Sequence, residues 1–144
     1  MKVKISHQPA YRFTATNEEN NTVNMDASPS IGGEGTGFRP MEILLAGLGG
    51  CSGIDVVNIL QKKKQAFDKF EVEINGHRDA NEVPSLFKDI EVEFRIEGND
   101  IQNEKIISAV QLSMDKYCSV AKTLEKTATI RYTILVNNNR IYPN

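Results

Sequence analysis

The stretch GFRPMEILLAGLGGCSGIDVVNILQKKK, residues 37–64, decides the fold. It predicts one long helix that begins at Pro40, where the missing N–H costs nothing, and ends at three lysines, whose charge suits a helix C-terminus. Apolar or small residues occupy nearly every side of it between Ile43 and Leu60, so we expect a helix that is buried almost all round. Each of its glycines costs about 1 kcal/mol relative to alanine. Their presence indicates that another helix or a sheet packs closely against this one.

The rest of the chain predicts strands on both sides of this helix. Period-two patterning around the polar turn at residues 18–21 predicts an antiparallel hairpin before it, and the Gly- and Ser-rich residues 28–37 predict a mobile loop. After it, alternation at residues 69–79 and 87–98 predicts two strands with one apolar face each. Helical spacing at residues 104–116, with Asn103 as the N-cap, predicts a second helix, followed by a short helix capped by Ser119 and a closing strand at residues 127–137.

This order of elements indicates an α+β fold, with a largely antiparallel sheet packed on a buried central helix. The chain has 144 residues, of which 40% are hydrophobic, and we expect one domain over residues 1–144. A formal net charge of -2 argues against nucleic-acid binding, because phosphate contacts need a concentrated basic surface.

We expect a cytoplasmic protein without a membrane span. The charged start is not followed by the apolar run of a signal peptide, and glycines and polar residues interrupt the long helix. No Gly-rich segment has the spacing of a phosphate loop, and two histidines are too sparse to form a zinc site with two separated cysteines. We therefore expect neither a cofactor nor a metal.

Cys51 and Cys118 are the candidate reactive groups. A cysteine on a buried helix is often an inert packing residue, whereas a reactive thiol needs a nearby cation or a helix N-terminus. Cys51 lies about three turns past Pro40, beyond the reach of the helix dipole, so its activation would need side chains. Cys118 directly precedes the predicted short helix. Spacing alone does not say whether the two sulfurs meet.

Asp55 lies one turn after Cys51 on the same helix face. Its carboxylate either accepts hydrogen bonds in a pocket or faces the solvent. The sequence leaves both alternatives open.

The segments RPMEILLAGLGGCSGIDVV (residues 39–57) and DKYCSVAKTL (residues 115–124) resemble the two signature regions of the OsmC/Ohr superfamily, the osmotically induced and organic-hydroperoxide-resistance proteins. The resemblance extends over nearly the whole chain, because the order of elements agrees too. It implies an intertwined homodimer in which a sheet of one subunit covers the helix of its partner. It also implies that Cys51 attacks a small organic hydroperoxide and that Cys118 resolves the sulfenic acid to a disulfide, which an external dithiol reductant reopens.

The sequence departs from the pattern of the reactive members, which pair a helix carboxylate with an arginine to hold the thiolate. Met41 stands at the carboxylate position, and Glu42 is one place further on, a rotation of about 100° on a helix. Arg39 is the remaining candidate arginine; the alternative is that it is a solvent-exposed residue before Pro40.

The loop before the helix offers Asp26 and Glu34, whose negative charges would oppose formation of a thiolate. We therefore expect a divergent branch of the family with weak peroxidase activity, carried by Cys51, Cys118, Glu42 and Arg39. The alternative is a binding or structural protein of the same fold, in which the pocket holds a small ligand and the cysteines are packing residues.

Overall fold

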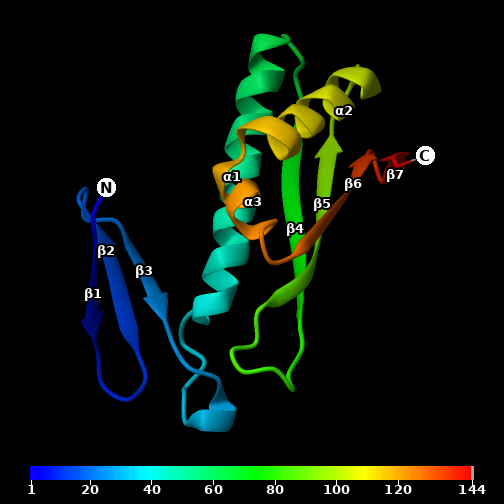
Figure 1. Cartoon of the computed structure of the whole chain (residues 1–144). Helices are drawn as coiled ribbons and strands as arrows, with labels where there is room; N and C mark the ends of the chain where they lie inside the picture. The colour runs from blue at the N-terminus through cyan, green and yellow to red at the C-terminus, as the bar shows by residue number, and fades with distance from the viewer. Residues whose placement is uncertain (144) are drawn as a thin grey trace. The chain divides into compact units, whose positions relative to one another are not determined.

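The N-terminal unit, Met1–Leu44, contains a three-stranded antiparallel sheet and the start of the long helix (Figure 1). The computed structural model describes residues 1–143. The strands are β1 (Val3–His7), β2 (Phe13–Asn17) and β3 (Thr22–Met25), paired in that order. Asn20 at the β2–β3 turn has a φ of 64°, a left-handed conformation that asparagine tolerates. The predicted hairpin is thereby confirmed.

The segment after β3 is organised around the carboxylate of Asp26, which is 2% exposed. The backbone N–H groups of Ala27, Glu34 and Thr36 donate to this carboxylate over 2.8–3.1 Å, and the Thr36 hydroxyl donates over 3.2 Å. A Cβ at Gly33 would lie 2.0 Å from the Ala27 carbonyl oxygen, so this position requires glycine. The segment predicted as a mobile loop therefore has a defined structure, which includes a short 3₁₀ turn, η1 (Pro29–Ile31).

The second unit begins at Leu45 and contains most of the long helix and a four-stranded sheet. Helix α1 spans Pro40–Lys62, as predicted. The elements that follow are β4 (Lys69–Arg78), β5 (Phe87–Glu97), α2 (Asn103–Leu112), the π-helical turn η2 (Ser113–Tyr117), α3 (Ser119–Leu124), β6 (Thr129–Val136) and β7 (Asn139–Tyr142).

The strand order in this sheet is β4-β5-β6-β7. The pair β4–β5 is antiparallel, as expected of a largely antiparallel sheet, and so is β6 with β7, a strand that the sequence did not predict, but β5 and β6 are parallel. A parallel pair needs a long crossover, which α2, η2 and α3 provide.

One face of this sheet carries the core. Alternate residues of β5 are almost fully buried, and they share that face with apolar residues of β4: Ile90, Val92, Phe94, Ile96, Phe70, Val72 and Ile74. Helix α1 packs against β4, where a Cβ at Gly49 would lie 3.1 Å from Ile74 Cδ1 and one at Gly53 3.5 Å from Phe70 Cε1. These two glycines therefore permit the close approach that the sequence predicted, whereas a Cβ at Gly47 or Gly50 would meet no other atom within 4 Å among residues 1–143.

Helix α1 buries one face only. Its buried residues recur every fourth position: Leu48, Ser52, Val56 and Leu60. Ile54 on another side is 72% exposed. The prediction that the helix is buried almost all round is therefore wrong for a single chain, because β4 and η2 cover only one side of it.

Helix α1 is long and apolar enough to cross a membrane, contrary to our expectation. The core helix of a soluble protein meets the same criterion of length and composition.

Candidate active site

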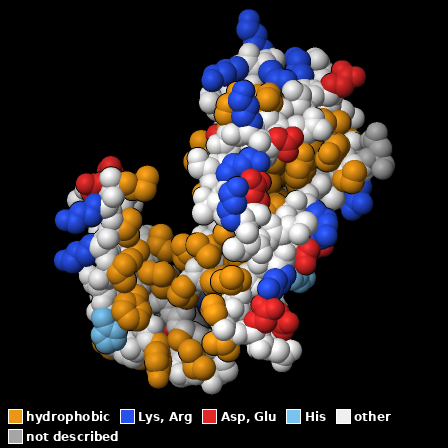
Figure 2. Space-filling view, viewed as in Figure 1, with side chains coloured by type: hydrophobic (Ala, Val, Ile, Leu, Met, Phe, Trp, Pro, Cys, Tyr) orange, Lys and Arg blue, Asp and Glu red, His pale blue; other side chains and the backbone are white. Residues whose placement is uncertain are grey.

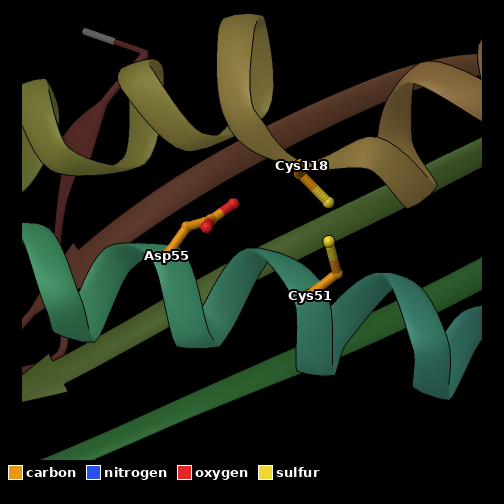
Figure 3. Close-up of side chains that lie close together, drawn as sticks. All are labelled: Cys51, Asp55 and Cys118. Atoms are coloured by element: carbon orange, nitrogen blue, oxygen red, sulfur yellow. The ribbon is translucent and has the colours of Figure 1, made fainter.

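Three side chains converge where α1 faces the end of η2 (Figure 3). Cys51 and Asp55 project from the same face of α1, one turn apart, and Cys118 approaches them from the opposite segment. The two sulfurs and a carboxylate oxygen of Asp55 all lie within 4.8 Å of one another. Both cysteines are free thiols. The fold thus brings together two residues that are 67 positions apart in the sequence (118 minus 51).

The π-helical turn η2 places Cys118. Because η2 widens the helix after Leu112, the backbone N–H of Cys118 donates to the Ser113 carbonyl over 2.8 Å. Cys118 is also the N-cap of α3, and its sulfur accepts a hydrogen bond from the Ala121 N–H at 3.4 Å. The cap predicted at Ser119 is therefore one residue too late.

The cap of the preceding helix differs from the prediction as well. Asn103 is the first helical residue of α2, and the N-cap is Gln102, whose side chain makes no capping bond.

The two thiols differ in exposure. Cys51 is partly exposed, whereas Cys118 is fully buried. Burial raises the pKa of Cys118 to about 11; the Ala121 N–H opposes this shift, and the neighbouring Cys51 adds to it. The hydrogen bond that Cys118 gains at the start of α3 is therefore outweighed by desolvation.

Asp55 is hydrogen-bonded at this site. The hydroxyl of Ser113, a buried residue, lies 3.3 Å from Asp55 Oδ2 and 3.3 Å from the Ser52 carbonyl oxygen. The structure thus supports the hydrogen-bonded alternative for Asp55. The four-residue spacing from Cys51 was a usable signal for Asp55, but nothing in the sequence pointed to Ser113.

Arg39 and Glu42 form a pair of their own at the start of α1. The Arg39 backbone N–H donates to Glu42 Oε2 over 2.8 Å, and the Arg39 Nε lies 3.9 Å from Oε1. Their side chains are 58% and 48% exposed. Both residues belong to the N-terminal unit and both thiols to the second, so the role of this pair at the thiols stays a prediction.

The structure thus combines an α+β fold with two facing thiols, one on α1 and one at the end of the helical crossover. The chain belongs to the OsmC-like protein family, whose model matches residues 33–133 and thus both cysteines. The predicted membership of the OsmC/Ohr superfamily and the α+β fold are confirmed.

The relatives and solved structures agree with this assignment. The chain is 45% identical to protein YhfA of Escherichia coli strain K12 over 94 residues. This aligned segment covers 65% of this chain and 69% of YhfA. A hypothetical protein from Aquifex aeolicus VF5 is 27% identical, with a TM-score of 0.82 over 94% of this chain and 95% of that one. An organic hydroperoxide resistance protein from Legionella pneumophila, with 11% identity and a TM-score of 0.69 over 93% and 96% of the two chains, shares the fold.

Proposed function

We propose that this protein is a cysteine-based peroxidase that reduces small organic hydroperoxides. The observation that carries the proposal is the facing pair of thiols, Cys51 and Cys118, which lie within 4.8 Å of each other and of a carboxylate. Family membership supports the proposal, because the family includes proteins of hydroperoxide resistance.

The thiol pair supplies the two electrons that reduction of a peroxide requires. The Cys51 thiolate attacks one oxygen of ROOH, the O–O bond breaks, and the alkoxide takes up a proton to leave as ROH. The Cys118 sulfur then attacks the sulfenic sulfur of Cys51, water leaves, and a disulfide forms. An external dithiol reduces this disulfide and restores both thiols.

The difference in exposure supports the proposed roles of the two cysteines. A peroxide has to reach the attacking sulfur, and Cys51 is the thiol that the solvent reaches. Cys118 needs to meet only the sulfenic acid of its neighbour, so this buried thiol does not have to be reached by the substrate. Glu42 and Arg39 would assist the Cys51 thiolate weakly, because Met41 stands at the position of the family's carboxylate.

We further propose that the protein acts as a homodimer in the cytoplasm. Large apolar side chains of α1 and of the N-terminal sheet stay exposed in a single chain, among them Ile54, Ile5 and Val3. A second subunit would cover them.

Thiol titration with cumene hydroperoxide and hydrogen peroxide tests the peroxidase proposal. We expect the reduced protein to lose two thiols for each peroxide consumed. Cys118→Ser should lose one thiol and hold a sulfenic acid that dimedone traps, and Cys51→Ser should consume no peroxide. Ser119→Ala, beside Cys118 but with both thiols present, is the matched control and should behave as the native protein. Full peroxide consumption by Cys51→Ser would remove the enzyme proposal and leave the binding-protein alternative.

A further inference from the structure

We propose that Cys51, Asp55 and Cys118 form a binding site for a thiophilic divalent cation, represented by Zn²⁺, with two thiolates and one carboxylate as ligands. The sequence argued against a metal, because two histidines were too few for a zinc site. The fold instead assembles a ligand set that needs no histidine.

The geometry is close to what zinc requires. Zinc–sulfur bonds of about 2.3 Å and zinc–oxygen bonds of about 2.0–2.2 Å place tetrahedral ligand atoms about 3.6–3.8 Å apart. The three candidate atoms already lie within 4.8 Å of one another. They therefore need to close by about 1 Å at most, which small side-chain rotations accomplish.

Two hydrogen bonds orient the ligands from outside. The Ser113 hydroxyl lies 3.3 Å from Asp55 Oδ2, and the Ala121 N–H donates to the Cys118 sulfur over 3.4 Å. Such outer contacts fix ligands at metal sites and raise their affinity. Each acceptor atom, Asp55 Oδ2 and the Cys118 sulfur, keeps further lone pairs with which it can bind a cation.

The ligand types select the ion. Magnesium and calcium require oxygen ligands, whereas thiolates favour zinc and other soft cations. Three protein ligands leave a fourth tetrahedral position for water, and the partial exposure of Cys51 gives that position access to solvent. Exchangeable binding is therefore expected, rather than a closed structural site.

A bound cation would compete with the peroxide chemistry, a consequence that rests on the proposed function. Both reactions use the same two sulfur atoms, so a zinc-bound Cys51 cannot attack a peroxide and a disulfide cannot bind zinc. The cation would protect the reduced pair, and oxidation of the pair would release it.

The test is a titration of the reduced, full-length protein with Zn²⁺ against a chromophoric chelator, with a phosphine as reductant, and a parallel titration with Co²⁺. We expect one ion for each chain and thiolate-to-cobalt charge-transfer absorption. Asp55→Asn should weaken Zn²⁺ binding at least tenfold, and Ser113→Ala, which keeps all three ligands, should weaken it several-fold. Asp68→Asn, the same charge change at an exposed position, is the matched control and should leave affinity unchanged.

Cys118→Ser should roughly halve the charge-transfer intensity, because one thiolate remains. Binding without charge-transfer absorption, or equal affinities for Asp55→Asn and Asp68→Asn, would overturn the proposal. The readout of this test is metal binding, not activity. Zinc binding by a protein without peroxidase activity would therefore overturn only the proposed function. Peroxidase activity in a protein that binds no zinc would overturn only the metal site.

Discussion

Asp26 is the residue on which the segment before α1 depends. One carboxylate satisfies three backbone N–H groups and a hydroxyl that would otherwise need separate partners. These bonds, that of Thr36 first, hold the pKa of Asp26 below its ordinary value of 3.8.

Replacement of Asp26 should make the chain less stable in a pH-dependent way. Because the folded pKa is depressed, the contribution of Asp26 to stability is complete above the ordinary pKa of 3.8, which applies to the unfolded chain, and is lost as the pH falls through the folded value. The urea midpoint of Asp26→Asn, followed by circular dichroism, should therefore lie below that of the native protein at pH 6, and the gap should narrow at about pH 3. A gap that widens on acidification would contradict this role. Asp68→Asn, at an exposed position, should show no comparable gap.

The two cysteines of the candidate site could be predicted from the sequence, but their environment could not. Cys51 and Cys118 stand in recognisable segments, and the four-residue spacing marked Asp55 as a neighbour of Cys51. Ser113 lies where α2 passes into η2, and its hydroxyl meets Asp55 across the contact between that segment and α1. This contact depends on tertiary packing, for which the local sequence pattern carries no signal.

Strand β4 contains a glycine that its packing requires. A Cβ at Gly76 would lie 2.4 Å from Phe87 Cε1 and 3.1 Å from Leu45 Cδ1. Phe87 is a buried residue of β5, so its ring has little room to move.

Gly76→Ala should therefore destabilise the fold by about 1–3 kcal/mol, the usual cost of overpacking a core. The measurement is the free energy of unfolding in urea. Asn75→Ala, on the exposed face of the same strand, should stay within about 0.5 kcal/mol of the native protein. If the two variants were equally stable, Phe87 would be free to move and the packing argument would fail.

Elements in which apolar residues recur with a long, clear periodicity could be predicted. A very short strand and the pairing between strands could not. The alternation in β4 and β5 gave both strands nearly to their ends, and α1 ends at Lys62 as expected. Strand β7 was missed because its four residues, Asn139–Tyr142, are too few to show a period. The parallel pairing of β5 with β6 depends on the path of the crossover, which periodicity does not encode.

The whole molecule leaves apolar surface exposed on both of its units. In the N-terminal unit, the three-stranded sheet exposes Val3, Ile5, Phe13 and Val23 by 40–56%, and Figure 2 shows hydrophobic side chains gathered over that unit. In the second unit, an apolar groove runs along α1 and β4, lined by Gly50, Ile54, Val57 and Phe70 among others. Contiguous exposed apolar surface of this kind is typical of interaction sites, so a partner surface is expected for it.

A charge in the groove of the second unit tests whether a second subunit covers it. Ile54 is 72% exposed in a single chain, so Ile54→Lys should leave an isolated subunit nearly unaffected. If the groove is buried in a homodimer, the variant loses about 1.5–3 kcal/mol of apolar burial and places a charge in the interface, which weakens the dimer at least tenfold.

Sedimentation at micromolar concentration should therefore find a dimer for the native protein and a monomer, or an unfolded chain, for Ile54→Lys. Val83→Lys makes the same kind of change at a loop position that is 97% exposed, and this control should remain dimeric. A folded, monomeric native protein would remove the support for the homodimer. Equal behaviour of the two lysine variants would show that the groove along α1 is free, and Gly50, which lines that groove, would then have no role in close packing.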